Sequence, residues 1–304
     1  MSKDSPKTFT ILSSFWLKII AIVTMTIDHI GVMLASNVGA NYWLAVTCRY
    51  IGRISLPLFC FLIVEGVLHT KRMGNYLLRL GIMATSVTLA LIVIGYSPLL
   101  GENTLWAQGN IFIDLLMGAL MVWALNNKKW YIKLLAVFPI AFAILAYFAR
   151  GYENSYSFVF AARVKWFPFF LRPQYDWLSL LFVLVFYLAH IFSDWFLQSH
   201  SNSSGIPVES LKGTTLERKA LNIISAGLLI STVLLYFLAS YAIPQEYVYW
   251  DRFIQNAAII SSAFVLLYSG KRGYNAKWFQ YGCYLYYPLH LIVIFGIGIL
   301  VMLI

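Results

Sequence analysis

The residues best suited to chemistry are ionisable side chains set inside long apolar runs. Asp28 and His29 stand in "TMTIDHIGVM", and His290 stands in "YLYYPLHL" near the end of the chain. Arg49 and Arg53 are four residues apart in another apolar run. Histidine takes up and releases protons near neutral pH, while paired carboxylate and guanidinium groups fix local charge and geometry. This set of residues predicts acid–base chemistry in an apolar environment.

The composition identifies that environment as a lipid bilayer. Of 304 residues, 61% are hydrophobic and 11% are charged, which excludes an ordinary soluble domain. The 10 Trp, 20 Tyr and 22 Phe suit a protein with many aromatic anchors at membrane interfaces. Cys48, Cys60 and Cys283 have neither CxxC spacing nor neighbouring ligand residues, so we expect no disulfide framework and no metal site.

Apolar runs of about 18 to 25 residues predict an all-α polytopic membrane protein, a bundle of about nine transmembrane helices with ten as the alternative. Basic loops alternate with loops that lack Lys and Arg, which places the N-terminus in the cytoplasm. The net charge of +10 therefore reflects basic residues in the loops predicted on the cytoplasmic side, and we expect no nucleic-acid partner. The predicted spans are 16–36, 43–69, 77–97, 110–126, 131–149, 175–197, 220–242, 252–269 and 279–303.

One segment departs from this alternation within what we expect to be one domain, residues 1–304. Residues 150–174 are aromatic but carry four basic residues, which favours an interfacial or re-entrant segment at the outer surface. Residues 198–219 are rich in Ser and Gly, which predicts a flexible cytoplasmic loop.

Depth along the helices indicates which polar groups can meet. With a rise of about 1.5 Å per residue, Asp28, His29, Arg53 and His290 fall in the middle to outer part of the membrane. We expect Asp28 to pair with an arginine of the next helix, because an unpaired buried carboxylate is costly. Burial favours a neutral imidazole, so His29 is the expected general base, with His290 as the alternative.

Each feature also has a purely structural interpretation. The Asp28–Arg53 pair can equally be a staple between two helices, and a buried histidine can simply bond a backbone carbonyl, although two at similar depth favour function. Asp114, near an outer helix end, can be solvated. Two pairs spaced by four residues suit hydrogen bonds near the inner surface. These pairs are Glu65 with His69, and His190 with Asp194.

The basic loops suggest where a phosphorylated ligand would bind. In "GKRG", Lys271 and Arg272 stand between glycines directly before the helix of His290. Cationic side chains bind phosphates, and glycine lets the backbone approach them. Lys71 and Arg72 lie in another loop predicted on the same side. The positive-inside rule alone also accounts for these four cations.

Three blocks of sequence resemble the TraX family. They are "LKIIAIVTMTIDHIG", "RYIGRISLPLFCFLIVEGVLHTKRMGNYLLRL" and "YSGKRGYNAKWFQYGCYLYYPLHL". The family is named for a conjugative-plasmid protein that acetylates the N-terminus of pilin, and it is similar to a wider class of membrane acyltransferases that use acyl-CoA. The positions that match are Asp28, His29, Arg49, Arg53, Pro57, Glu65, Lys271, Arg272, Tyr287 and His290.

The resemblance implies an acetyl-CoA-dependent acetyltransferase of the bacterial cytoplasmic membrane. The donor would be cytosolic acetyl-CoA, and the acceptor an extracytoplasmic pilin, peptide, glycan or cell-wall polymer. The expected catalytic residues are His29, Asp28, His290 and Arg53. The expected CoA-binding residues are Lys271, Arg272, Lys71 and Arg72, and those expected at the substrate or oxyanion are Arg49, Tyr287 and Glu65.

Other function classes remain open at this stage. Intramembrane Asp, His, Arg and Glu also suit a proton-coupled carrier, although no paired halves with matching broken helices are evident. A noncatalytic assembly protein would explain the paired charges but not two deep histidines. Within the enzyme hypothesis, direct transfer and transfer through an acetyl-histidine are both compatible with the sequence.

Overall fold

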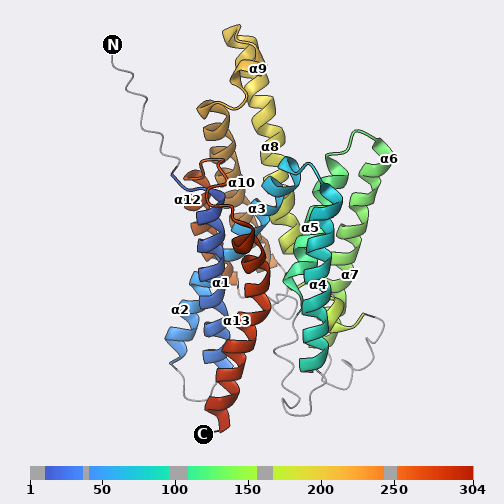
Figure 1. The fold of residues 1–304 in the computed structure, drawn as a ribbon, viewed down its shortest axis with the longest axis vertical. Coiled ribbons are helices and arrows are strands. Elements are labelled where there is room, and N and C mark those ends of the chain that lie inside the picture. The colour runs from blue at the N-terminus through green and yellow to red at the C-terminus, as the bar shows by residue number, and fades with distance from the viewer. Residues whose placement is uncertain (1–10, 37–40, 96–108, 156–166, 243–251, 304) are drawn as a thin grey trace.

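The structure, a computed structural model, confirms the expected all-α architecture. The helices lie side by side and alternate in direction between the two ends of a bundle (Figure 1). In the part of the chain that the structure describes, the only strand-like pairing is an isolated bridge between Leu12 and Tyr268. The described residues are 11–36, 41–95, 109–155, 167–242 and 252–303.

The helices vary widely in length, and several of the predicted spans consist of more than one helix. Their bounds, in chain order, are α1 Ser14–Ser36, α2 Tyr42–Gly52, α3 Ser55–His69, α4 Met73–Gly95, α5 Ile111–Leu125, α6 Trp130–Lys133, η3 Leu134–Ala136, α7 Val137–Ser155, η5 Phe169–Leu171, α8 Trp177–Ser204, α9 Val208–Leu211, α10 Thr215–Ala242, α11 Arg252–Gln255, η7 Asn256–Ile260, α12 Ser261–Leu266 and α13 Lys277–Leu303.

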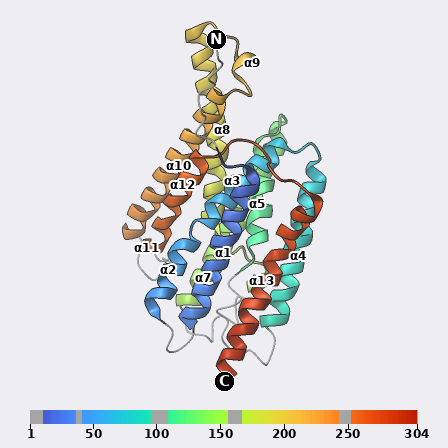
Figure 2. The ribbon, with the colours of Figure 1, turned by 60° about the vertical axis from the view of Figure 1, so that its left-hand side comes forward.

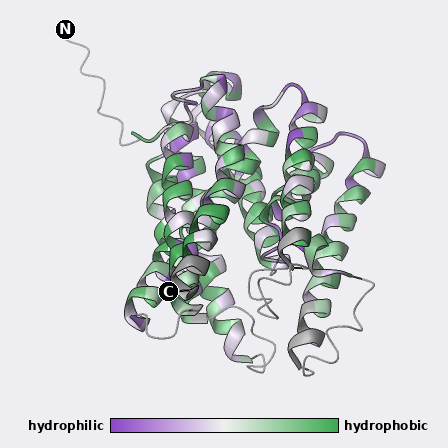
Figure 3. Cartoon of the chain, turned by 60° about the horizontal axis from the view of Figure 1, so that its bottom comes forward, coloured by the Kyte–Doolittle hydropathy of each residue, from purple (hydrophilic) through white to green (hydrophobic). Residues whose placement is uncertain are grey.

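The length and hydropathy of these helices identify a multi-pass membrane protein. Figure 3 shows apolar residues along the helices and hydrophilic stretches where helices meet loops. Among the described residues, 6 segments are long and apolar enough to cross a bilayer. The count of nine spans and the cytoplasmic N-terminus stay predictions. The six segments are Ser14–Ala35, Tyr42–His69, Met73–Ile92, Trp130–Ala149, Trp177–Ser204 and Thr215–Ala242.

The second predicted span, 43–69, is a broken helix rather than a continuous one. Pro57 has no N–H to offer the carbonyl of Arg53, and its ring would clash with that carbonyl in a regular helix. The chain therefore ends α2 at Gly52 and begins α3 at Ser55. Ser55 Oγ donates to the Gly52 carbonyl at 2.8 Å, and Ser261 Oγ donates to the Ile54 carbonyl at 3.1 Å. The two serine hydroxyls thus donate hydrogen bonds to backbone carbonyls at the break, which lipid could not do.

Residues 198–219 differ from the expected loop because both neighbouring helices continue into them. α8 runs to Ser204, where Gly205 adopts a left-handed conformation (φ 71°) and ends the helix. α9 follows, and α10 begins at Thr215. Figure 1 shows this region projecting beyond the neighbouring helices. The Ser-rich sequence favours a helix end here, since Ser side chains bond to carbonyls of the last turn.

The segment 150–174 is only partly within the described residues. Residues up to Ser155 extend α7, and residues 156–166 lie outside the description. Phe167 packs against Ala146 and Ala149 of α7, and Arg172 donates to the Phe167 carbonyl at 2.9 Å. The location of segment 150–174 at the extracytoplasmic surface of the membrane stays a prediction.

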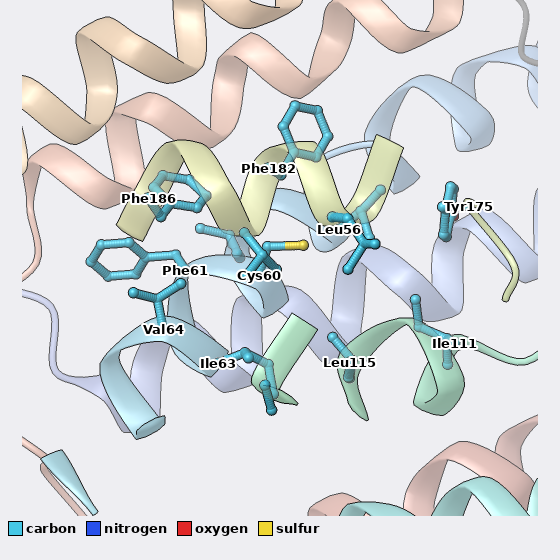
Figure 4. Packing of buried hydrophobic residues seen from close by; sticks show 14 of the residues in the cluster. Leu56, Cys60, Phe61, Ile63, Val64, Ile111, Leu115, Tyr175, Phe182 and Phe186 are labelled. Atoms are coloured by element: carbon cyan, nitrogen blue, oxygen red, sulfur yellow. The ribbon is translucent and has the colours of Figure 1, made fainter. Parts of the chain in front are cut away.

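α3 lies at the centre of the core, and other helices pack around it. Figure 4 shows its side chains between those of α8 and α5. Phe61 is 1% exposed, and its ring meets the edge of Phe186 at 5.2 Å between centroids. On the other side of the bundle, α13 runs beside α1 and near α4 (Figure 2). We call the end at which α1 and α4 begin and α3 ends the basic end, because Lys18, Arg79 and Arg272 lie there.

Small residues allow α1 and α2 to approach closely. A Cβ at Gly52 would overlap the carboxylate group of Asp28, and one at Gly31 would lie 2.7 Å from Cys48 Cβ. Close helix contacts through Gly are common in membranes, where packing rather than the hydrophobic effect holds helices together. Gly52 thus makes room for the side chain on which the polar centre depends.

Replacing Gly52 tests this packing. We expect Gly52→Ala to destabilise the purified protein by about 1–3 kcal/mol, because the added methyl must displace Asp28. Thermal unfolding in detergent measures the effect. Gly81→Ala is the control, since a Cβ there meets nothing within 4 Å. Equal unfolding temperatures for the two variants would contradict the close packing of Gly52 on Asp28.

Candidate active site

Two histidines from opposite ends of the sequence meet inside the bundle. His29 Nδ1 on α1 and His290 Nε2 on α13 are 2.7 Å apart, and their rings stack with centroids 5.0 Å apart. Both side chains are buried, at 8% and 6% exposure. The expectation that they lie at similar depth is fulfilled by direct contact.

The hydrogen bonds of this pair determine which nitrogen can accept a proton. His290 Nδ1 lies 2.9 Å from the Tyr286 carbonyl, which can only accept, so this nitrogen carries the hydrogen. In a neutral His290, Nε2 is then the acceptor, and His29 Nδ1 must donate to it. His29 Nε2 is left with a lone pair, and it has no hydrogen-bond partner among the described residues.

Asp28 lies beside this pair and is held by two arginines. Arg53 Nη2 is 2.8 Å from Asp28 Oδ1, and Arg49 Nη1 is 2.7 Å from Asp28 Oδ2. Asp28 and Arg53 are buried, whereas the Arg49 side chain is 24% exposed. The expected ion pair is therefore confirmed, and both candidate arginines take part in it. Each oxygen of the carboxylate has its own charged donor, as a buried carboxylate requires.

A cavity leads from the basic end toward the histidines. Its volume is about 470 Å³, within the range of small-molecule sites, and α1, α3, α4, α5 and α13 all contribute to its wall. The wall is basic near Lys18 and apolar near Met25 and Phe112. Tyr287 is the lining residue of α13 farthest from the basic end, and its ring lies 6.2 Å from that of His29. The apolar end of the cavity therefore abuts the histidine pair.

Of the four residues expected to bind CoA, one lies on the cavity wall. All four residues are exposed, and of them Arg272 lines the cavity while Lys271, Lys71 and Arg72 do not. The loop of Arg272 is fixed by the start of α1, because Ser14 donates from its backbone to the Lys271 carbonyl (2.8 Å) and from Oγ to the Arg272 carbonyl (3.0 Å). The four cations were grouped because their loops are predicted on the same side of the membrane, but only Arg272 lies on the cavity wall.

Glu65 belongs to a second polar cluster, away from the histidines. It lies ten residues after the start of α3, about 15 Å along the helix axis. Arg218 Nη1 is 3.3 Å from Glu65 Oε1, and Tyr268 Oη donates to Oε2 at 3.2 Å. Glu65 thus joins α3 to α10 and to the loop before α13, and its expected role at the substrate or oxyanion stays a prediction.

His69 bonds Glu65 as expected, with its Nδ1 2.9 Å from the Glu65 carbonyl oxygen, whereas His190 and Asp114 have surroundings that differ from those expected. His190 Nε2 lies 3.2 Å from Glu65 rather than next to Asp194, which is exposed. Asp114 is buried rather than solvated, at 1% exposure. Its carboxylate accepts from the Gln174 and Tyr175 backbone and from Ser179 Oγ at 2.5, 3.1 and 2.6 Å, so it holds the start of α8.

The structure adds cations to the site that the sequence analysis did not assign to it. Lys18 and Arg79 line the cavity, and Arg218 binds Glu65. For Lys18 a signal was present, because Lys18, Met25 and His29 are spaced so that they share one face of a helix. No comparable signal identifies Arg218, whose partner is 153 residues away in the sequence.

Comparison with known proteins assigns the chain to a family. The sequence pattern of the family described as TraX protein matches residues 13–298. The chain belongs to the TraX family. The match includes α1, α3 and most of α13, and thus every residue of the histidine pair and the Asp28 cluster. No solved structure matches the chain.

One curated relative of this TraX family member is named as a fimbrial assembly protein. The chain is 31% identical over 138 residues to the "Probable fimbrial assembly protein FimC, serogroup H1" of Dichelobacter nodosus. The match covers 44% of this chain and 55% of the relative. The chain therefore spans little more than half the length of that relative.

The Asp28 cluster leads to a prediction about stability. Arg53→Met should destabilise the protein by about 3–5 kcal/mol, because it leaves a buried carboxylate short of a partner. Arg49→Met should cost less, since Arg49 is partly exposed. Unfolding in detergent measures both variants. In an Asp28→Asn background the difference between them should shrink, and an undiminished difference would show that Arg53 acts through other contacts.

Proposed function

We propose that this protein is an integral membrane acetyltransferase that moves an acetyl group from acetyl-CoA to an amine or hydroxyl of an extracytoplasmic acceptor. The observation that carries the proposal is the buried His29–His290 pair at the apolar end of a cavity whose other end is basic. A donor with a charged head, a long uncharged arm and a reactive thioester at its tip matches that polarity. Family membership supports the same reaction class.

In this mechanism His29 is the general base. Its Nε2 takes the proton of the acceptor amine or hydroxyl as that group attacks the thioester carbonyl. The C–S bond then breaks, the acetyl group stays on the acceptor, and the CoA sulfur leaves and receives the proton. His290 holds His29 in the tautomer that exposes Nε2, and it accepts the Nδ1 hydrogen bond more strongly once His29 is charged.

The arginines supply positive charge next to the reaction. Arg49 uses one of its five N–H donors on Asp28. Its remaining donors are available to the oxyanion that develops on the attacked carbonyl. Arg53 is fully buried against Asp28 and serves to hold the carboxylate and Arg49 in place. Tyr287 Oη bonds Gln174 at 3.3 Å, so its part is to shape the wall between cavity and histidines.

The name of the Dichelobacter nodosus relative, a probable fimbrial assembly protein, supports an acceptor on a fimbria. We infer a pilin or another surface peptide amine as the first acceptor to test, with glycan and wall polymer as further classes. The basic end would face the cytosol of a bacterium, in keeping with the positive-inside rule, and the enzyme would lie in its cytoplasmic membrane. Acetyl-CoA is then the donor, and no metal is needed.

Replacing His29 separates catalysis from donor binding. We expect His29→Ala to slow the release of CoA from acetyl-CoA by about 10²–10⁴-fold, because the general base is lost. Acetyl-CoA affinity should stay within about twofold, since the phosphates bind at the other end of the cavity. The assay uses purified protein in nanodiscs, with water or a pilin N-terminal peptide as acceptor. A folded wild type that neither binds nor cleaves acetyl-CoA would overturn the proposal in favour of a carrier or assembly role.

Two substitutions at His290 test its role in fixing the His29 tautomer. Gln can accept the His29 Nδ1 hydrogen bond, whereas Leu of similar size cannot. We expect His290→Gln to keep CoA release within about tenfold of wild type, and His290→Leu to lose about 100-fold or more. The pH profile of the Leu variant should also change, because His29 loses its oriented partner. Equal rates for Gln and Leu would remove His290 from the mechanism.

A further inference from the structure

The basic end of the cavity carries positive charge without matching negative charge. Lys18 from α1, Arg79 from α4 and Arg272 from the loop before α13 line its wall, and Glu65 is the only acidic residue among the described residues that line it. Glu65 is already bound by Arg218 and Tyr268. Within the described residues, none of the three cations has a carboxylate at salt-bridge distance. A concave site with surplus charge of one sign concentrates ligands of the opposite sign.

The three cations lie at matching depth. α1 and α4 both begin at the basic end (Figure 1). Lys18 is four residues into α1 and Arg79 six residues into α4, which places them about 6 Å and 9 Å from the helix starts. Arg272 follows Ser269 and Gly270, where the loop is held by the Leu12 carbonyl and by the start of α1. The backbone therefore places all three cations around the opening of the cavity at its basic end, which we call its mouth.

Away from its basic end, the cavity wall changes from charged to apolar over a short distance. From Lys18 to Met25 on α1 is about 10 Å along the axis, and beyond Met25 the lining residues are apolar or aromatic, such as Phe59 and Phe112. A ligand that satisfies this wall must be anionic at one end and uncharged at the other. A free inorganic anion would fill only the mouth.

We propose that Lys18 and Arg79, together with Arg272, bind the phosphate groups of the donor and set its depth so that the thioester reaches His29. This inference rests on the proposed function and deepens it, since neither Lys18 nor Arg79 had a role. The ligand chemistry is a phosphate ester carrying a long uncharged arm, as in CoA. An anionic lipid shares the phosphate chemistry, so the test must separate the two sources.

Calorimetric titration of the protein in zwitterionic nanodiscs tests the assignment. CoA, dephospho-CoA and pantetheine are titrated into wild type, Lys18→Met, Arg79→Met and Lys18→Arg. We expect each Met variant to weaken CoA binding about tenfold or more, as charged hydrogen bonds are lost, and to leave pantetheine unaffected. Lys18→Arg should retain most of the affinity. Added salt should weaken CoA binding less in the Met variants than in wild type.

The matched control removes Lys71 and Arg72, two cations that shortly precede Arg79 in the sequence but do not line the cavity. Lys71→Met with Arg72→Met should leave CoA affinity within about twofold, because both side chains are exposed and do not line the cavity. Unchanged CoA affinity in Lys18→Met and Arg79→Met, or equal wild-type affinity for CoA and pantetheine, overturns the inference. A nanodisc with phosphatidylglycerol that abolishes CoA binding in wild type but not in Lys18→Met assigns the cations to lipid and also overturns it.

The outcomes separate this inference from the proposed function. CoA binding that survives both Met substitutions, with CoA release still dependent on His29, refutes the phosphate site and leaves the acetyltransferase standing. CoA binding that is lost with Lys18 and Arg79, without any acetyl-CoA cleavage by wild type, supports the phosphate site and refutes the acetyltransferase. The His29→Ala variant should bind CoA as wild type does in either case.

Discussion

The burial of the Asp28 carboxylate is the constraint on which the rest of the site depends. In a bilayer no water can share the charge, so Asp28 requires donors from the protein itself, and Arg49 and Arg53 supply one to each oxygen. That requirement brings α2 against α1 through Gly52 and Gly31. Pro57 separately causes the helix break, because it has no N–H for the Arg53 carbonyl, and this break leaves Arg53 at the end of α2, where it binds Asp28. With α1 held in this way, His29 faces α13 and meets His290.

The cavity has two chemically distinct ends, and the histidine pair lies next to one of them, behind Tyr287. One end is basic and open to a charged ligand, and the other is apolar and closed by Tyr287 beside the histidines. The second cluster, in which Glu65 binds Arg218 and Tyr268, joins α3, α10 and the loop of Arg272. Because Asn222 of α10 also donates to the Tyr268 carbonyl at 2.7 Å, this cluster positions the mouth as the Asp28 cluster positions the apolar end.

Much of this arrangement follows from the sequence, for physical reasons. Charges inside apolar runs must find partners, and helix rise fixes depth, so the Asp28–arginine pairs and the proximity of His29 and His290 were predictable. The break in the second span was also encoded, in Pro57, but hydropathy averaged over a window does not register a single proline. Depth alone did not say that Arg79 lines the cavity, since that depends on rotation about the axis of α4, or that Lys71 and Arg72, in the loop before α4, do not line it. The pairing of Glu65 with Arg218 joins distant helices, which no local pattern reveals.

The measurement that tests the account most directly is a structure of the protein in nanodiscs with a ketone analogue of acetyl-CoA, which cannot lose its acyl group. The account predicts the analogue in the cavity, with its phosphates at Lys18, Arg79 and Arg272 and its carbonyl within reach of His29 Nε2 and Arg49. An analogue bound elsewhere, or bound with its acyl end away from the histidine pair, would contradict the account.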